Sequence, residues 1–262
     1  MATPNRKVLD ISHWNTVTSW SNIVSAGILG VINKATEGTY YTDSSYLQNC
    51  APCYRSGLCW GAYHFATSED PHRQVDFFLS VVGIDNETLY ALDWEDNPSG
   101  GTMTASQAKS FVQYLESKIG ANRCVIYSGN TAKQALGSTK DPFWGAHRLW
   151  LAQYSSSPAP QASWDKYWIW QYSDGVNGPG PHNCPGVSGD CDTNSYAGAD
   201  DQLIKEWTGA APTPEPVPPV AQAEVDITIA TKGDVIVNIN GQTFKVGRSM
   251  VTKRTDIQGG NL

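Results

Sequence analysis

Charge is scarce in this sequence, and long hydrophobic runs are missing. Asp, Glu, Lys and Arg make up 16% of the 262 residues, against roughly 25% in ordinary soluble domains. The formal net charge is −7, whereas proteins that bind nucleic acid need a basic surface. No stretch of about 18 consecutive apolar residues is present, which excludes an ordinary membrane-spanning helix. The composition therefore predicts no nucleic-acid partner and no membrane insertion.

Six cysteines are present, but no metal-binding pattern among them is complete. Cys184 and Cys191 bracket a loop rich in Pro and Gly, so they could form a disulfide or remain free thiols. Cys50, Cys53 and Cys59 are closely spaced, but a structural zinc site requires four ligands and no fourth is evident. We expect buried thiols or a disulfide in this group, and no metal.

Composition divides the chain near its C-terminal end. Residues 210–223 carry a Pro-rich run that is typical of an extended linker. Residues 224–262 contain three short alternating stretches, with a turn signal at Asn240-Gly241. A β module of this size is marginally stable alone, so we expect it to bind a ligand or to form a homo-oligomer. Residues 1–209 then form the main domain.

The main domain alternates β-like runs with helical patterns. The eight β-like runs are residues 8–14, 29–36, 60–66, 89–95, 124–128, 148–154, 167–172 and 190–194. Helical patterns follow the first five runs, at residues 17–26, 43–55, 68–82, 104–119 and 130–136. We expect Asp43 to cap the second helix and Thr104 with Gln107 to form a capping box before the fourth.

Alternating strands and helices imply a parallel sheet, and eight strands suggest that it closes. We therefore predict an α/β fold, an irregular TIM-like (β/α)5(β)3 barrel, followed by the small all-β module. A doubly wound open sheet also fits this pattern.

Two carboxylates stand close together at the end of the fourth β-like run. Strand side chains alternate, so Asp93 and Glu95 should point to one side and Trp94 to the other. In a closed barrel that side is the lumen, which opens at the C-terminal ends of the strands. Burial and mutual repulsion would raise the pKa of one carboxyl, and glycosidic cleavage needs such a pair. The same residues could also be a solvated acidic strand end.

Further acids favour a catalytic site over that alternative. Asp10 lies near the end of the first β-like run, and Asp192 and Asn194 share one face of the last. The first and last strands are neighbours in a closed barrel, so acids from three strand ends should converge on one mouth. A fold core has no need of this arrangement.

Eight motifs in order carry a family resemblance. They are Asp10-Ile-Ser-His-Trp14, Gly30-Val-Ile-Asn-Lys-Ala-Thr-Glu-Gly38, Gly61-Ala-Tyr-His-Phe65, Leu92-Asp-Trp-Glu95, Tyr127-Ser128, Trp150-Leu-Ala-Gln-Tyr154, Trp170-Gln-Tyr172 and Asp192-Thr-Asn194. Over about residues 7–207 the chain resembles the family 25 glycoside hydrolases, the lysozymes of bacteriophages and bacteria. The resemblance does not extend to residues 224–262.

The resemblance implies an activity and a catalytic set. The activity is hydrolysis of the β-1,4 bond between N-acetylmuramic acid and N-acetylglucosamine in peptidoglycan, without a cofactor. Glu95 matches the family's general acid, and Asp93 matches the carboxylate that acts at the anomeric carbon, as a nucleophile or by orienting the substrate's N-acetyl group. Asp10 and Asp192 match two supporting acids. Trp94 replaces an aliphatic residue of many relatives, on the side away from the lumen.

Other side chains at the mouth fit contacts with sugar, and the expected substrate-binding set is Lys34, Glu37, Tyr63, Phe65, Tyr127 and Trp150. The aromatic members could instead be barrel core, and the charged pair could be a structural ion pair.

Two other functions fit parts of the pattern, namely a chitinase-like barrel glycosidase and a non-catalytic carbohydrate-binding barrel. The biological setting that we expect is a phage endolysin. Residues 1–7 lead directly into the first strand without an apolar leader. We therefore expect synthesis in the host cytoplasm without a signal peptide and action on the cell wall after holin-type release. Residues 224–262 would then bind the cell wall or form an oligomer.

Overall fold

The computed structural model describes residues 4–209, 225–229, 235–239 and 242–246. Its chain falls into two compact units, Met1–Pro212 and Thr213–Leu262. The predicted linker and the predicted turn at Asn240-Gly241 lie outside the described residues.

The first unit is a closed barrel. Its eight strands are β1 Arg6–Ile11, β3 Gly30–Glu37, β5 Cys59–Phe65, β6 Leu89–Asp93, β7 Cys124–Ser128, β8 Arg148–Ala152, β9 Ile169–Ser173 and β11 Asp192–Ser195. The strands from β1 through β3 and β5 to β9 pair in parallel, and β11 closes the ring as an antiparallel strand between β9 and β1. The predicted TIM-like barrel is therefore confirmed, and the open sheet is excluded.

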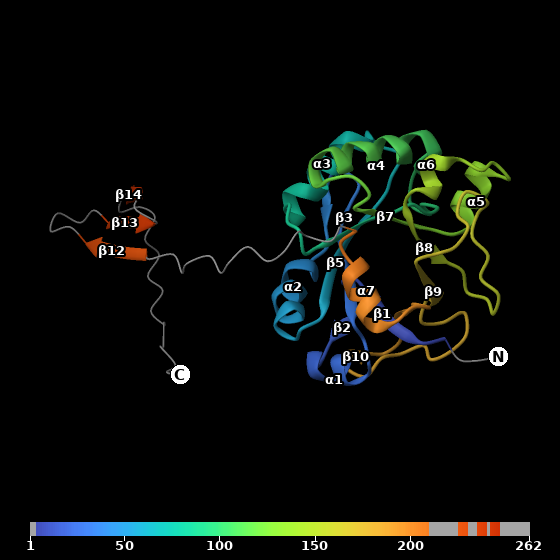
Figure 1. The fold of residues 1–262 in the computed structure, drawn as a ribbon, viewed down its shortest axis with the longest axis horizontal. Helices are drawn as coiled ribbons and strands as arrows, with labels where there is room; N and C mark the ends of the chain where they lie inside the picture. The colour runs from blue at the N-terminus through green and yellow to red at the C-terminus, as the bar shows by residue number, and fades with distance from the viewer. Residues whose placement is uncertain (1–3, 210–224, 230–234, 240–241, 247–262) are drawn as a thin grey trace. The chain divides into compact units, whose positions relative to one another are not determined.

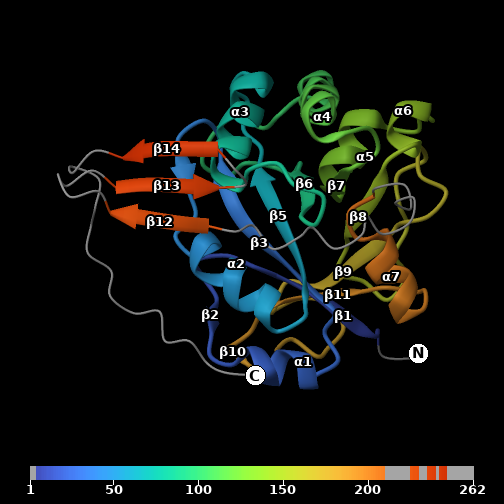
Figure 2. The ribbon, with the colours of Figure 1, turned by 60° about the vertical axis from the view of Figure 1, so that its left-hand side comes forward.

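Helices surround the strands, as Figures 1 and 2 show. They are α1 Trp20–Ser25, α2 Tyr46–Arg55, α3 Pro71–Val82, α4 Ala105–Ile119, α5 Asn130–Leu136, α6 Pro142–Gly145 and α7 Asp200–Glu206. Three further strands are only two residues long. They are β2 Thr16–Val17, β4 Tyr41–Thr42 and β10 Val187–Ser188. No helix links β8 to β9 in the described residues, which agrees with the fading of helical pattern after residue 145.

The two expected helix caps had different outcomes. Thr104 and Gln107 form the capping box before α4, as predicted. Asp43 does not cap α2, because the helix begins one residue after Ser45. The Asp43 carboxylate instead accepts bonds from the Ser45 hydroxyl at 2.7 Å and from the His13 ring at 2.7 Å. Its oxygens tie the loop after β1 to the segment between β4 and α2.

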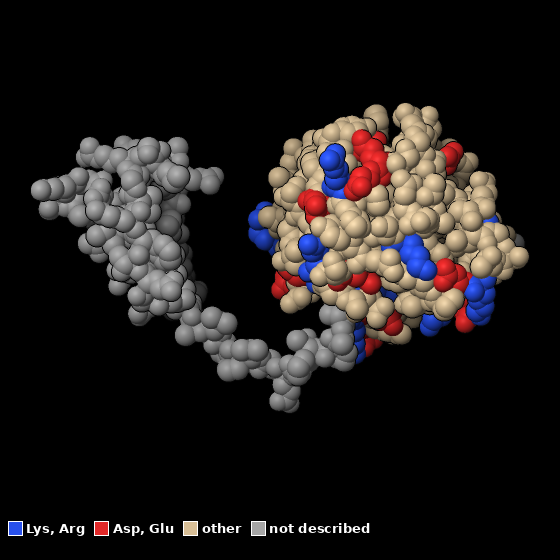
Figure 3. Space-filling model, turned by 90° about the horizontal axis from the view of Figure 1, so that it is seen from above, with Lys and Arg blue, Asp and Glu red and all other residues tan. Residues whose placement is uncertain are grey.

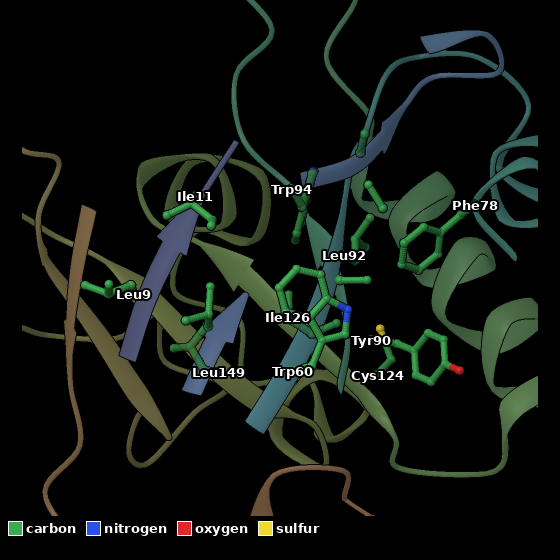
Figure 4. Close-up of a cluster of buried hydrophobic side chains, with 14 of the residues drawn as sticks. Leu9, Ile11, Trp60, Phe78, Tyr90, Leu92, Trp94, Cys124, Ile126 and Leu149 are labelled. Atoms are coloured by element: carbon green, nitrogen blue, oxygen red, sulfur yellow. The ribbon is translucent and has the colours of Figure 1, made fainter. Parts of the chain in front are cut away.

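Strand alternation builds two separate hydrophobic layers. One layer lies between the barrel and its helices and includes Leu9, Leu92 and Trp94, three of the side chains in Figure 4. The other fills the barrel and includes Val8 and Ala91. Because Val8 and Ala91 face inward, the side chains two residues further along β1 and β6 face inward as well. This alternation directs Asp10 and Asp93 into the barrel.

Trp94 faces the helices, as the sequence predicts. Its ring stacks on Trp144 with centroids 5.1 Å apart, and its indole nitrogen donates to the carbonyl oxygen of Met103 at 2.8 Å. The departure from an aliphatic residue at this position therefore serves packing outside the barrel.

Gly30 allows the C-terminal part of the first unit to close one end of the barrel. Trp207 is buried, and its indole nitrogen donates to the carbonyl oxygen of Trp60 at 2.7 Å. A β-carbon on Gly30 would overlap the Trp207 ring. We predict that Gly30→Ala lowers the free energy of unfolding by about 1–3 kcal/mol, as overpacking does. Chemical denaturation checks this, with Gly100→Ala as control because it meets only an Asn97 side chain. Equal effects of the two changes would contradict it.

The second unit contributes a three-stranded antiparallel sheet of β12 Val225–Ile229, β13 Val235–Ile239 and β14 Gln242–Val246. Within the described parts of the chain, no helix is both long and apolar enough to span a membrane. Figure 3 shows one face of the first unit, where charged side chains are scattered over a mostly uncharged surface, as the 16% charged composition implies.

Candidate active site

Four acidic residues meet at the mouth where the parallel strands end. Asp10 lies near the end of β1, Asp93 ends β6, and Glu95 follows two residues later. Asp192 begins β11 and pairs directly with Asp10 in the strand register. The sequence placed Asp192 at a strand end, but β11 is antiparallel, so the beginning of this strand lies at the mouth. The structure thus brings the four predicted acids to one end of the barrel.

A network of buried hydrogen bonds fixes Asp10. Its carboxylate accepts from the Asn194 side-chain amide at 2.7 Å and from the Gln171 side-chain amide at 2.9 Å. Asn194 is held in turn by the Trp150 indole at 2.6 Å, and Gln171 by the Tyr127 hydroxyl at 2.8 Å. Burial raises the pKa of Asp10 to about 6 despite these bonds. The network keeps this carboxylate in one position under the site.

Gln171 and Tyr154 are site residues that the sequence did not single out. The Tyr154 hydroxyl donates to the Gln171 side chain at 2.8 Å, and its ring is 38% exposed at the mouth. Both stand within motifs of the family resemblance, but their role depends on the pairing of β8, β9 and β11. Alternation from the inward-facing Ile169 could have placed Gln171 in the barrel.

Glu95 holds its proton near neutral pH. Burial is the main cause that raises the pKa of Glu95 to about 7, and the Asp10 charge adds to it. Lys34 opposes the shift. Glu95 lies beyond the end of β6, so the loop rather than the strand positions it. A partly buried acid with this pKa can donate a proton to a substrate.

Asp93 is the more buried member of the central pair, with 5% of its surface exposed. Burial raises its pKa well above the usual range, and the Glu95 charge adds to this shift. One carboxyl oxygen, Oδ1, is buried without a hydrogen-bond partner. Such an atom is costly in a folded protein, and a positive charge that develops nearby would offset part of that cost.

The predicted sugar contacts differ in exposure. Tyr63 and Phe65 are partly exposed, whereas Tyr127 is 7% and Trp150 is 1% exposed. The buried Trp150 ring has no face open to a sugar, so the predicted stacking does not agree with its position. Trp150 instead supports the site through Asn194 and an edge contact with the Tyr127 ring, 4.6 Å between centroids.

Lys34 and Glu37 form the ion pair that the sequence left open. The Lys34 ammonium lies 2.6 Å from the Glu37 carboxylate and 4.8 Å from the centre of the Phe65 ring. Lys34 also lowers the pKa values of Asp93 and Glu95. The pair therefore stands close enough to tune the acids, and substrate contact by either member stays a prediction.

The cysteines are free thiols in this structure, including Cys184 and Cys191, whose pairing the sequence left open. Burial raises the pKa of the Cys191 thiol to about 12, so the thiol stays protonated at neutral pH. Among the described residues, no group of three or more His, Cys, Asp or Glu side chains is arranged to hold a metal ion.

Asp192 should make the stability of the fold depend on pH. Burial, followed by the charge of Asp10, raises the pKa of Asp192 from its usual 3.8 to about 9. Between these values the folded state holds the extra proton, so its stability falls as pH rises, by up to about 1.4 kcal/mol per pH unit. We predict that Asp192→Asn flattens this slope and unfolds at higher denaturant concentration than the wild type at pH 8.

Denaturation from pH 5 to pH 8 measures this effect. Asp165→Asn is the control, because Asp165 pairs with Lys140 on the surface, where its side chain is 86% exposed. Parallel pH profiles for the wild type and Asp192→Asn would show that Asp192 is not held protonated.

Comparison with known proteins agrees with this geometry. The family model for glycosyl hydrolases family 25 matches residues 9–181. Lysozyme M1 of Streptomyces globisporus is 33% identical over 214 residues, which cover 75% of this chain and 69% of that protein. A bacterial lysozyme structure from Streptomyces coelicolor is 30% identical, with a TM-score of 0.70 over 80% of this chain and all of that one. The CTP1L endolysin structure is 27% identical, with a TM-score of 0.60 over 77% of this chain and 70% of that one. The chain belongs to glycosyl hydrolases family 25.

Proposed function

We propose that this chain is an N-acetylmuramidase that hydrolyses the β-1,4 bond between N-acetylmuramic acid and N-acetylglucosamine in peptidoglycan. The observation that carries the proposal is the pair Asp93 and Glu95 at the mouth of a closed barrel, where burial raises both pKa values. The likeness to lysozymes supports the choice of substrate.

Glu95 acts first, as the general acid. Because the pKa of Glu95 is about 7, the carboxyl is largely protonated below that pH and can donate to the glycosidic oxygen as the bond breaks. The leaving sugar departs with this proton, and water later attacks the anomeric carbon while the Glu95 carboxylate takes up a proton from it. This cycle returns Glu95 to its acid form.

Asp93 acts on the other side of the bond, as the ionised member of the pair: while Glu95 holds its proton, the Glu95 charge that raises the pKa of Asp93 is absent, and Lys34 lowers that pKa. The Asp93 carboxylate has two possible chemical roles: it attacks the anomeric carbon, or it accepts the N–H of the substrate N-acetyl group. Both uses stabilise the positive charge that develops at that carbon. Asp10 contributes negative charge to the mouth and raises the pKa of Glu95, whereas Asp192 keeps its proton below a pKa of about 9 and bonds the Asp10 side chain.

Identification of the bond that is cut tests this function. Purified protein is incubated with peptidoglycan from several Gram-positive walls, the products are reduced, and their new ends are identified by mass spectrometry. Reduced muramic acid ends are expected. Glucosamine ends, or cleavage of chitin without cleavage of walls, would indicate a different barrel glycosidase. A wall that binds the protein but yields no products would support a non-catalytic carbohydrate-binding barrel.

We also propose the biological setting of a phage endolysin, made in the host cytoplasm and active on the wall after release. The likeness to the CTP1L endolysin supports this setting. Expression of the chain in a susceptible host, with and without a holin, tests it. Lysis that depends on the holin is expected, whereas lysis without one would point to another route of export.

Residues 224–262 serve wall binding in this proposal, which would hold the enzyme near a solid substrate. The alternative is self-association through the same residues. Deletion of residues 210–262, followed by wall sedimentation and measurement of solution mass, separates the two. Loss of sedimentation is expected, and a fall in mass to that of a monomer would indicate an oligomerisation element.

A further inference from the structure

A cavity lies at the end of the barrel opposite the four acids. It is open to solvent and has a volume of about 670 Å³, a size typical of small-ligand sites. Its walls come from the beginnings of β8 and β9, the residues after β11, and α7. The parallel strands begin at this end, whereas Asp93 and Glu95 stand where the strands finish. The cavity is therefore separate from the active site, and the cleavage reaction does not use it.

Aromatic rings line this cavity in fixed positions. Tyr167 and Trp168 precede β9 and are partly exposed. The Trp168 indole nitrogen donates to the Glu206 carboxylate at 2.8 Å, and the Arg148 guanidinium carbon lies 4.6 Å from the centre of the Trp168 ring. The guanidinium covers one face of this ring, so a flat apolar surface can stack only on the opposite face.

Polar groups surround these rings. Glu206 accepts from the Tyr196 hydroxyl and from the Gln202 side-chain amide, each at 2.8 Å. Arg148 donates to the carbonyl oxygens of Glu206, Trp207 and Arg123 through its terminal nitrogens. Its remaining nitrogen, Nε, is buried without a partner. Because Nε is buried, it is not open to the cavity, and the polar side chains that the wall offers a ligand are Glu206, Gln202 and Lys166.

The charges in the cavity wall balance. Arg148 and Lys166 contribute two positive charges, and Asp165 and Glu206 contribute two negative ones. A strongly charged ligand would meet as much repulsion as attraction. Apolar faces flanked by amide, carboxylate and ammonium groups suit a neutral ring compound that carries hydroxyl and amide groups.

We propose that this cavity binds an N-acetylated sugar unit of a glycan strand. The sugar face stacks on Tyr167 and on the free face of Trp168, and its hydroxyl and acetamide groups bond Gln202 and Lys166. Because the inference rests on the proposed function, the ligand is the same polymer that the active site cuts. Holding a strand at one end of the barrel keeps the other end near further bonds by raising their effective concentration.

Binding of a soluble oligomer of N-acetylglucosamine tests the proposal. The full chain carrying Glu95→Gln is titrated with the tetramer and followed by NMR of the tryptophan indole groups and by calorimetry. Saturable shifts of the Trp168 indole signal are expected, and adding Trp168→Ala should weaken the binding event at this cavity by about tenfold or more. An unshifted Trp168 signal at saturation of the active site would overturn the proposal.

Two further variants keep the test informative if loss of Trp168 disturbs the Glu206 network. Tyr167→Ala and Lys166→Ala alter the cavity without removing a hydrogen bond of that network, and each should weaken the same event. Ile204→Ala is the matched control on α7, because Ile204 is 52% exposed and does not line the cavity. If Tyr167→Ala, Lys166→Ala and Ile204→Ala all bound the tetramer with equal affinity, the proposal would be overturned. The readout is binding, so failure here is distinguishable from failure to cleave walls.

Discussion

Replacing Glu95 with Gln should reduce the turnover of peptidoglycan by about 10²- to 10⁴-fold, which is the usual contribution of a general acid. Gln has nearly the same shape but cannot release a proton to the leaving sugar. The pKa of about 7 means that the wild-type carboxyl is largely protonated below neutral pH. Clearing of a wall suspension, with release of reducing ends, measures the loss.

A substrate with a better leaving group is the control for this variant. An aryl muramoside with a highly acidic phenol needs little help from an acid, so Glu95→Gln should cleave it at a rate close to that of the wild type. A variant that fails equally on both substrates would indicate a folding or binding defect rather than loss of the acid. Full activity on walls would show that another group supplies the proton.

Replacing Asp93 with Asn should reduce turnover by about 10²- to 10³-fold, as expected when a group that stabilises developing charge is removed. Asp93 is 5% exposed at the mouth of the barrel. The Asn amide keeps the size of the side chain but carries no negative charge. Steady-state kinetics on soluble wall fragments should show the loss in kcat rather than in KM, because the charge develops only in the transition state.

The acetamide group of the substrate distinguishes the two uses of Asp93. If the N-acetyl oxygen attacks the anomeric carbon, successive fluorination of the acetyl methyl should slow the wild type steeply. If Asp93 attacks directly, that series should be nearly flat and a covalent adduct should be trapped on Asp93 by a 2-fluoro sugar. Wild-type turnover retained in Asp93→Asn would contradict both uses.

Strand periodicity predicted the eight strands, but it left an open sheet possible and did not give the direction of the last strand. The fifth expected run, residues 124–128, coincides with β7, and the others lie within a few residues of their strands. Nothing in the spacing of residues 190–194 shows whether they run parallel or antiparallel, because side-chain alternation is the same in both. The short ladder of β2 with β10 also depends on contacts between distant loops.

The acids could be predicted because each one stands beside a strand end and outside the hydrophobic pattern. The bond from Gln171 to Asp10 and the support given by Trp150 could not be predicted, because both depend on partners on other strands. The sequence suggests that Trp150 is an aromatic residue at the mouth of the barrel. The pairing of β8 with β7 and β9 buries it instead. The cavity at the opposite end is likewise formed by segments that are distant in sequence.

Direct titration of the Glu95 carboxyl tests the central claim most directly. Protein labelled with carbon-13 at the glutamate side chains is followed by NMR from pH 3 to pH 9, and the Glu95 signal is assigned by its absence in Glu95→Gln. The account predicts a midpoint near 7, with kcat on walls falling as pH rises through the same value. A midpoint near the usual 4.5 would mean that Glu95 is ionised at neutral pH and would contradict its role as the acid.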